Sequence, residues 1–228
     1  MKKFGSEHFA LEDTGATGNL HQARGSLRDL LVLYLVFIAL WSVAVLVVWK
    51  FGFLPEPERQ WFRTAAWIGT VAVWIIWQRP PSPAKWLGLF PVRPREVALV
   101  MIAFSVIFCW NFLRVTILSP PLERLATTTS DILLWSFIGV FVEELLFRGV
   151  IQTQLAERLV PSVAVLVAAT LFLFIHIPGW TILSIAVDAP TVVTVYLVGI
   201  ISGALRHSTE SLWPAVAIHW ANNLGAML

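Results

Sequence analysis

The stretch Glu143-Glu144-Leu145-Leu146-Phe147-Arg148 places two adjacent carboxylates and an arginine inside a sequence that otherwise resembles a membrane-buried helix. From residue 132 to residue 142 the one weakly polar side chain is Ser136, and the sequence stays compatible with a helix as far as Leu159. A charged side chain at the bilayer centre costs ~2.5 to 3.5 kcal/mol on insertion scales, so such residues usually face a protein interior or a water-filled cavity. The stretch therefore predicts a functional site inside a helical membrane protein.

Helix geometry gives the two carboxylates different roles. Successive residues lie about 100° apart around the axis, so Glu143 and Glu144 point in different directions. Glu144 precedes Arg148 by four residues, a spacing and an order that favour an ion pair, so Arg148 is predicted to be a structural clamp. Glu143 has no basic residue at either of these spacings after it, and Gly139, one turn before it, leaves room for another chain or a substrate. Glu143 is therefore predicted to be the freer carboxylate.

The composition indicates an all-α, polytopic transmembrane helix bundle. The 228 residues are 57% hydrophobic and 13% charged, with twelve Trp and a mean hydropathy of +0.76, whereas a soluble domain has ~25% charged residues. The net charge is +2, but the basic residues are scattered between hydrophobic runs, which argues against a nucleic-acid partner and makes the lipid bilayer the expected one. A single cysteine, Cys109, excludes an intrachain disulfide and a thiolate metal cluster.

Seven apolar runs are candidates for membrane spans, which need ~20 residues each. The runs are 30–49, 64–77, 97–118, 132–149 with an extension, 162–177, 182–205 and 212–228. The fifth is short and is expected to be bounded by Pro161 and Pro178, since proline ends helices. The expected organisation is a polar N-terminal tail over 1–28, N-terminal transmembrane helices over 29–129 and a catalytic helix core over 130–228.

The distribution of Lys and Arg predicts the orientation. With seven spans and an inner amino terminus, eleven basic residues fall on the inner side and five on the outer side. Inner loops carry the excess of basic residues. The amino terminus is therefore expected to be cytoplasmic, in a protein of the bacterial inner (plasma) membrane.

Two further polar positions interrupt the later apolar runs. If the helices on either side of Val160 form a hairpin, Glu143 lies 17 residues before the turn and His176 lies 16 after it. At about 1.5 Å per residue the two side chains would then lie at nearly the same depth. In the last run His219 and Asn223 share one helix face. They could hydrogen-bond to a neighbouring helix, for ~0.6 to 2 kcal/mol, or they could take part in chemistry.

These groups match the needs of peptide-bond hydrolysis. A water can be activated between a carboxylate and an imidazole, here Glu143 and His176, while donors such as His219 and Asn223 stabilise the oxyanion. An alternative is zinc held by Glu143, His176 and His219, because three such ligands plus water form a usual catalytic set. The sequence lacks H-E-x-x-H, so the metal-free reaction is favoured.

The three motifs Glu143-Glu144-x-x-x-Arg148, Phe172-x-x-x-His176 and His219-x-x-x-Asn223 resemble those of the CAAX prenyl endopeptidase and bacteriocin-processing family of intramembrane proteases. The resemblance covers about residues 130–228. It implies a membrane endopeptidase in which Glu143 and His176 activate water, Glu144 belongs to the site, and His219 and Asn223 form the oxyanion site. It also implies membrane proteins or lipidated peptides as substrates.

Two other classes of function fit parts of this pattern. A proton-coupled transporter also uses buried Glu and His, but it commonly shows paired halves, and the sequence has no internal repeat. A non-catalytic scaffold or bacteriocin-immunity-type protein would keep Glu144 and Arg148 for packing. It would have little need for Glu143, His176, His219 and Asn223 at convergent positions.

Overall fold

The computed structural model describes residues 25–118 and 135–227, and within them it contains helices and no strand. In chain order the elements are α1 (Leu27–Ala44), η1 (Val45–Lys50), α2 (Glu58–Gln78), α3 (Pro83–Leu87), α4 (Pro94–Leu113), η2 (Arg114–Leu118), α5 (Ser136–Glu144), η4 (Leu145–Ile151), α6 (Gln152–Ala156), α7 (Pro161–Phe174), α8 (Ile177–Ile182), α9 (Ala189–Thr209) and α10 (Trp213–Met227). The η elements are π-helical turns that continue the α-helix before them. The all-α prediction is confirmed.

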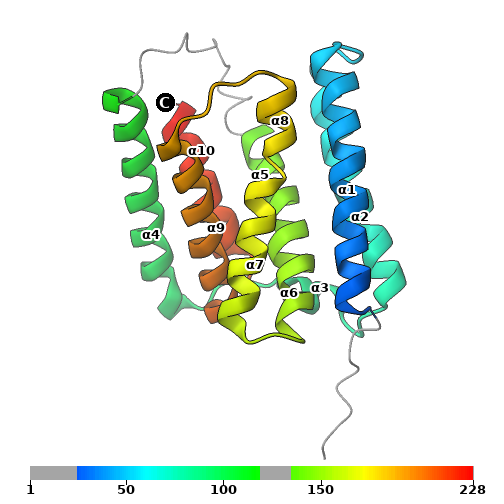
Figure 1. Ribbon diagram of the computed structural model, residues 1–228. Coiled ribbons are helices and arrows are strands. Elements are labelled where there is room, and N and C mark those ends of the chain that lie inside the picture. Colours follow the sequence, from blue (N-terminus) through cyan, green and yellow to red (C-terminus); the bar gives the residue numbers. More distant parts are fainter. Residues whose placement is uncertain (1–24, 119–134, 228) are drawn as a thin grey trace, which may run out of the picture.

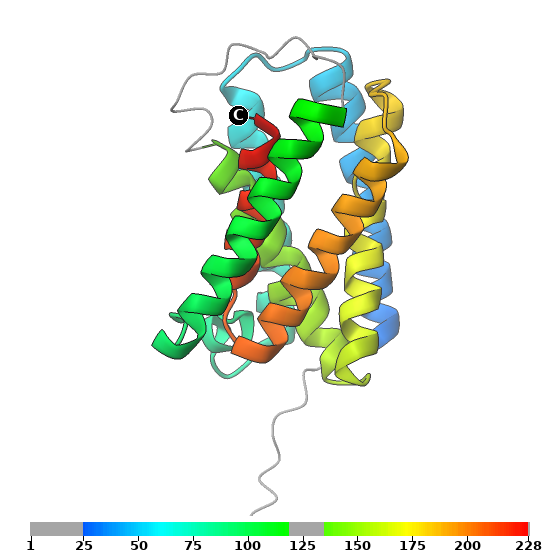
Figure 2. The same cartoon turned by 90° about the vertical axis from the view of Figure 1, so that its left-hand side faces the viewer.

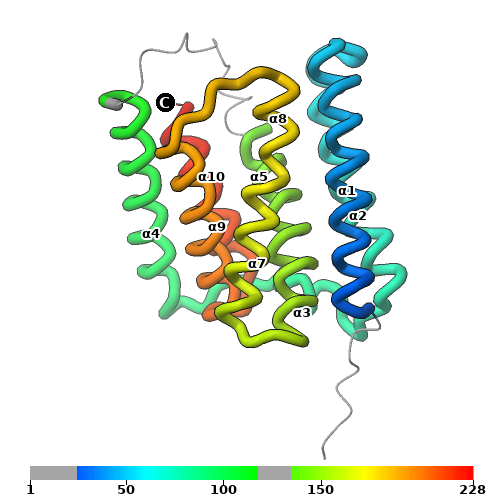
Figure 3. The backbone as a smooth tube through the Cα atoms, viewed as in Figure 1, coloured from blue at the N-terminus to red at the C-terminus, as the bar shows by residue number. Residues whose placement is uncertain are grey.

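The long helices run side by side as a bundle (Figure 1). The α1–α2 pair lies at one side and α4 at the other, with α5 to α10 between them, and the turned view shows α4 in front of the bundle (Figures 1 and 2). Helix α10 packs against α4, α9 and α5, whereas α2 packs against α5 and η4. The backbone trace shows the short connection between α6 and α7 that makes them a hairpin (Figure 3). The centre of the bundle is therefore the helix that carries the acidic motif.

Burial follows from that central position. Every residue from Val142 to Ile151 is buried, including Glu143, Glu144 and Arg148. By contrast, α1 and α4 expose large apolar side chains along one face, as expected for helices that contact lipid.

Capping residues fix where two of the helices begin. Ser26 caps α1 in a reciprocal capping box with Asp29. Asp188 caps α9 by accepting from the Thr191 amide at 2.9 Å, with Pro190 in the first turn. The run predicted over 182–205 is therefore wrong at its start, because the helix begins at Ala189.

The predicted tail lies outside the described residues up to position 24. Its last residues are held in the bundle: the Gly25 amide donates to Gln78 Oε1 at 2.9 Å, and the Gly25 carbonyl accepts from Gln154 Nε2 at 3.0 Å. Helix α1 begins at Leu27, directly after these contacts.

Four helices of the described residues are long and apolar enough to cross a membrane, namely 27–50, 94–117, 161–182 and 189–209. The predicted count of seven is not matched by these four. The three other predicted spans are too short, too charged or not apolar enough to be counted with these four. Trp side chains and Arg63 make α2 less apolar, three charged residues interrupt α5 to α6, and α10 has 15 residues.

The fifth run does not end at Pro178 as predicted. Helix α7 ends at Phe174, the chain makes one turn at Ile175 and His176, and α8 continues in the same span to Ile182. Pro178 lies in the first turn of α8, where its missing N–H costs no helical hydrogen bond. The proline therefore marks a break within the span, and His176 lies at that break.

Candidate active site

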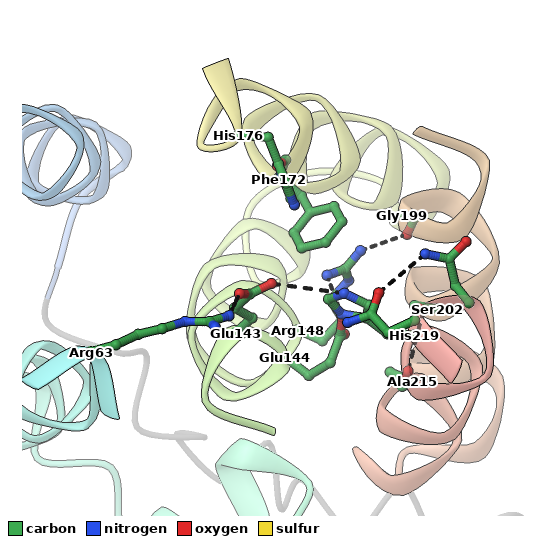
Figure 4. Close-up of polar contacts among 12 residues, drawn as sticks. Arg63, Glu143, Glu144, Arg148, Phe172, His176, Gly199, Ser202, Ala215 and His219 are labelled. Atoms are coloured by element: carbon green, nitrogen blue, oxygen red, sulfur yellow. Dashed lines mark hydrogen bonds and ion pairs between the residues drawn. The ribbon is translucent and has the colours of Figure 1, made fainter. Parts of the chain in front are cut away.

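Side chains from α2, α5, η4, the α7–α8 break and α10 meet in the interior of the bundle (Figure 4). Glu143 and Glu144 lie on the central helix, with Arg63 reaching Glu143 from α2 and His219 reaching both carboxylates from α10. Polar groups this deep in an apolar bundle need partners, and most of them have one.

Glu144 is the acceptor at the centre of this network. Its Oε1 accepts from Arg148 Nη1 at 2.9 Å and from His219 Nδ1 at 2.8 Å, and the side chains of Glu144 and Arg148 are both fully buried. The predicted pairing of Glu144 with Arg148 is therefore present. The bond to His219 was not anticipated, and it orients the imidazole, since a ring whose Nδ1 donates to a carboxylate turns Nε2 the other way.

Arg148 joins three helices. Its Nη2 donates to the Gly199 carbonyl of α9 at 3.0 Å, and its guanidinium lies 4.3 Å from the ring centroid of Phe172 on α7. One turn later Gln152 Nε2 donates to the Gly203 carbonyl at 2.8 Å. Glycine at 203 leaves room for the Gln152 side chain, because a Cβ there would lie 2.7 Å from Gln152 Oε1. This arrangement agrees with the clamp predicted for Arg148.

Glu143 has a partner that the sequence did not indicate. Arg63 Nη2 of α2 forms an ion pair with Glu143 Oε1, while Oε2 lies 3.8 Å from His219 Nε2. The guanidinium occupies the space beside Gly139, where a Cβ would lie 3.0 Å from both Nη atoms. The space expected at Gly139 is thus real. Glu143 is the more exposed of the two carboxylates, at 11% against 0% for Glu144, and it lines the cavity, so it is the freer one as predicted, although it is ion-paired.

His176 gains its orientation from the break between α7 and α8. There the His176 amide bonds three residues back to Leu173 instead of four, and the imidazole Nδ1 lies 2.8 Å from the Phe172 carbonyl. A carbonyl only accepts, so Nδ1 is the protonated nitrogen and Nε2 carries the lone pair. Phe172 also separates the two imidazoles, with ring centroids 4.9 Å from His176 and 5.2 Å from His219.

Glu143, His176 and Arg63 line one cavity of about 250 Å³. The equal depth predicted for Glu143 and His176 is consistent with this shared wall. Most of the remaining lining is apolar, with Trp41 and Trp67 from the α1–α2 side and Trp180 from α8. The cavity therefore combines a few polar groups with an aromatic surface, as ligand sites commonly do.

Asn223 lies one turn beyond His219 on α10, and its Oδ1 accepts from Asn222 Nδ2 at 3.2 Å. Asn222 in turn is held to α4, because its carbonyl accepts from Asn111 Nδ2. Asn223 is not among the residues that line the cavity, as far as the described part of the chain defines it. The structure thus brings together Glu143, Glu144, His176 and His219, and it leaves Asn223 on the adjacent turn.

The predicted zinc ligands do not form a metal-binding group in this arrangement. Within 25–118 and 135–227 no three His, Cys, Asp or Glu side chains are placed to hold a metal ion. Glu143 is instead ion-paired with the guanidinium of Arg63, a cation where zinc would add a second positive charge. The arrangement of these side chains therefore does not favour a zinc site.

The region that carries the three motifs is similar to a known protein family. Residues 125–225 match the family described as type II CAAX prenyl endopeptidase Rce1-like. The comparisons with curated proteins and with solved structures return no match. The match begins before α5 and ends within α10, so it spans Glu143, His176, His219 and Asn223, whereas Arg63 lies outside it.

Proposed function

We propose that this chain, which carries a type II CAAX prenyl endopeptidase Rce1-like domain over residues 125–225, is an intramembrane endopeptidase that uses Glu143 and His176 to activate water. The observation that supports this most directly is that both side chains line one cavity, with the Nδ1 of His176 committed to a backbone carbonyl. A water between the Glu143 carboxylate and the free Nε2 would meet two acceptors that can take its proton.

The reaction follows from these positions. Glu143 takes a proton from the water as the oxygen attacks the carbonyl carbon of the peptide bond. The carbonyl oxygen becomes an oxyanion, which His219 stabilises with both ring nitrogens protonated, Nδ1 donating to Glu144 and Nε2 to the oxyanion, together with Asn223 as the resemblance implies. The proton held by Glu143 then passes to the nitrogen as the carbon–nitrogen bond breaks, which releases the amine and restores the carboxylate.

Glu144 acts through His219 in this proposal. It holds Nδ1 at 2.8 Å, so Nε2 faces Glu143, which lines the cavity. Arg148 supports Glu144 from the other side and takes no part in the chemistry. As proposed, the reaction uses no metal ion.

The cavity wall supports an apolar substrate. Trp41, Trp67 and Trp180 offer aromatic surface beside the polar groups, which suits the membrane segment or lipid group of a membrane protein or lipidated peptide. The four apolar spans support an integral membrane location. We place the protein in a bacterial inner membrane with a cytoplasmic amino terminus.

The test compares wild type with Glu143→Gln on a set of membrane-anchored peptides, with cleavage followed by mass spectrometry. Gln keeps the shape of the side chain and removes its basicity, so turnover should fall by ~10² to 10⁴ while folded yield stays near wild type. Each protein is assayed with and without a chelator. Cleavage that a chelator abolishes and zinc restores would replace the metal-free mechanism, and undiminished cleavage by Glu143→Gln would exclude Glu143 as the base.

A further inference from the structure

We infer that Arg63, on the N-terminal helix α2, is a catalytic residue of this site that donates to the carbonyl oxygen of the scissile peptide bond. The inference rests on the proposed endopeptidase function and adds a residue outside the matched region 125–225. The steps of the hydrolysis stay the same. Water supplies the oxygen, Glu143 carries the proton to the leaving amine, and Arg63 stabilises the negative charge on the carbonyl oxygen between these steps.

The position of Arg63 is the first argument. Its guanidinium forms an ion pair with Glu143 and lines the same cavity as His176. It therefore lies on the side of Glu143 away from His219 of α10, next to the base that activates water (Figure 4). A substrate carbonyl close enough to be attacked by a water on Glu143 must also pass close to the guanidinium on Glu143.

The spare donors of Arg63 are the second argument. A guanidinium has five N–H groups in a rigid plane, and the hydrogen bond that the structure gives Arg63 uses Nη2 on Glu143. The side chain is 27% exposed, against 0% for Arg148. Both terminal nitrogens of Arg148 donate to Glu144 and Gly199, and its Nε is buried. Within 25–118 and 135–227 the hydrogen bond of Arg63 goes to Glu143 alone, which leaves donors for a ligand in the cavity.

The third argument is that this position is built. Gly139 lies one turn before Glu143, and a Cβ there would lie 3.0 to 3.1 Å from three guanidinium atoms of Arg63. A Cβ at 139 would require the guanidinium to shift by a few tenths of an ångström, so glycine at 139 permits the position that Arg63 occupies beside Glu143. A simple tether between α2 and α5 would not need this close approach, because Arg can reach a carboxylate from many rotamers.

The experiment measures kcat and KM for Arg63→Gln and Arg63→Lys. Loss of one oxyanion donor lowers kcat by about 10² to 10³, so Arg63→Gln should lose that much with KM changed by less than about fivefold. Arg63→Lys should keep part of the rate because it keeps the charge. Arg59→Gln is the matched control: Arg59 lies one turn earlier on α2 and donates to the Leu54 carbonyl, and its kcat should match wild type.

A second measurement separates catalysis from folding. Guanidinium ion added to Arg63→Ala should restore part of kcat, and it should not restore Glu143→Gln. Wild-type kcat in Arg63→Gln, or a loss that follows the folded fraction and resists guanidinium, would overturn the inference. The endopeptidase proposal survives that outcome, provided that the wild-type chain cleaves the peptides and that Glu143→Gln cleaves them ~10² to 10⁴ times more slowly. If wild type and Glu143→Gln behave alike, the proposed function fails, and the role of Arg63 fails with it.

Discussion

Replacing Arg148 by Met tests whether the arginine is a clamp. The substitution removes the hydrogen bond from Nη1 to Glu144 at 2.9 Å and that from Nη2 to the Gly199 carbonyl at 3.0 Å. Met fills similar volume and is flexible enough to pack against Phe172. The loss is therefore mainly electrostatic, since a fully buried carboxylate is left without its cation.

The expected magnitude follows from that burial. Breaking a buried ion pair by removing one partner costs about 3 to 5 kcal/mol. Leaving the buried Gly199 carbonyl without a donor costs a further ~1 to 3 kcal/mol. Because the two losses belong to one hydrogen-bond network, the total is smaller than their sum. A total near 4 kcal/mol should lower the melting temperature by roughly 8 to 16 °C for a chain of this size.

Thermal unfolding of purified protein in detergent measures this loss, and turnover is normalised to folded protein. Arg148→Met together with Glu144→Gln should melt above Arg148→Met alone, because Gln removes the stranded charge and keeps an acceptor for His219 Nδ1. Arg95→Met is the control: the Arg95 side chain is 74% exposed, so the change should stay within about 0.5 kcal/mol. A melting temperature near wild type for Arg148→Met, or wild-type folding with no turnover, would refute the clamp.

Three further changes test other contacts. Gly203→Ala places a Cβ 2.7 Å from Gln152 Oε1 and 3.0 Å from Val165, so thermal unfolding should show a loss of about 1 to 3 kcal/mol, whereas Gly69→Ala, in open space on α2, should be neutral or stabilising. Gly139→Ala should lower kcat at unchanged melting temperature by moving the Arg63 guanidinium away from Glu143. His176→Gln should lower kcat by ~10² to 10⁴ with normal folding, measured against His207→Gln, whose side chain is exposed at the end of α9.

The sequence predicted those parts of the site that depend on local geometry. The pairing of Glu144 with Arg148 follows from a four-residue spacing on one helix, and the structure contains it at 2.9 Å. The hairpin near Val160 follows from Pro161, and α6 and α7 flank that turn. The ion pair was inferred from helix periodicity and the hairpin from one turn signal. Both are properties of the local sequence, so the packing of neighbouring helices does not change them.

The contacts that the sequence did not indicate join segments far apart in the chain. Glu143 was expected to be the freer carboxylate because partners were sought within one helical turn, and its ion-pair partner Arg63 lies 80 residues away. The bond from His219 to Glu144 spans 75 residues. Such pairs depend on how helices pack, and a single sequence carries no direct signal for them. Gly139 was a partial signal, since it predicted space without naming the occupant.

The breaks within helices mark where function outweighs regularity. Proline at 178 suggested an end to the fifth span, yet the helix resumes, and the single irregular turn between α7 and α8 frees the Phe172 carbonyl to hold His176. The central helix similarly becomes π-helical directly after Glu144, a distortion found often at functional sites. Both irregularities lie next to residues proposed to act on substrate. In a uniform α-helix the His176 amide would donate to the Phe172 carbonyl, whereas here that amide donates to Leu173 and the imidazole is the polar group that contacts the Phe172 carbonyl, at 2.8 Å.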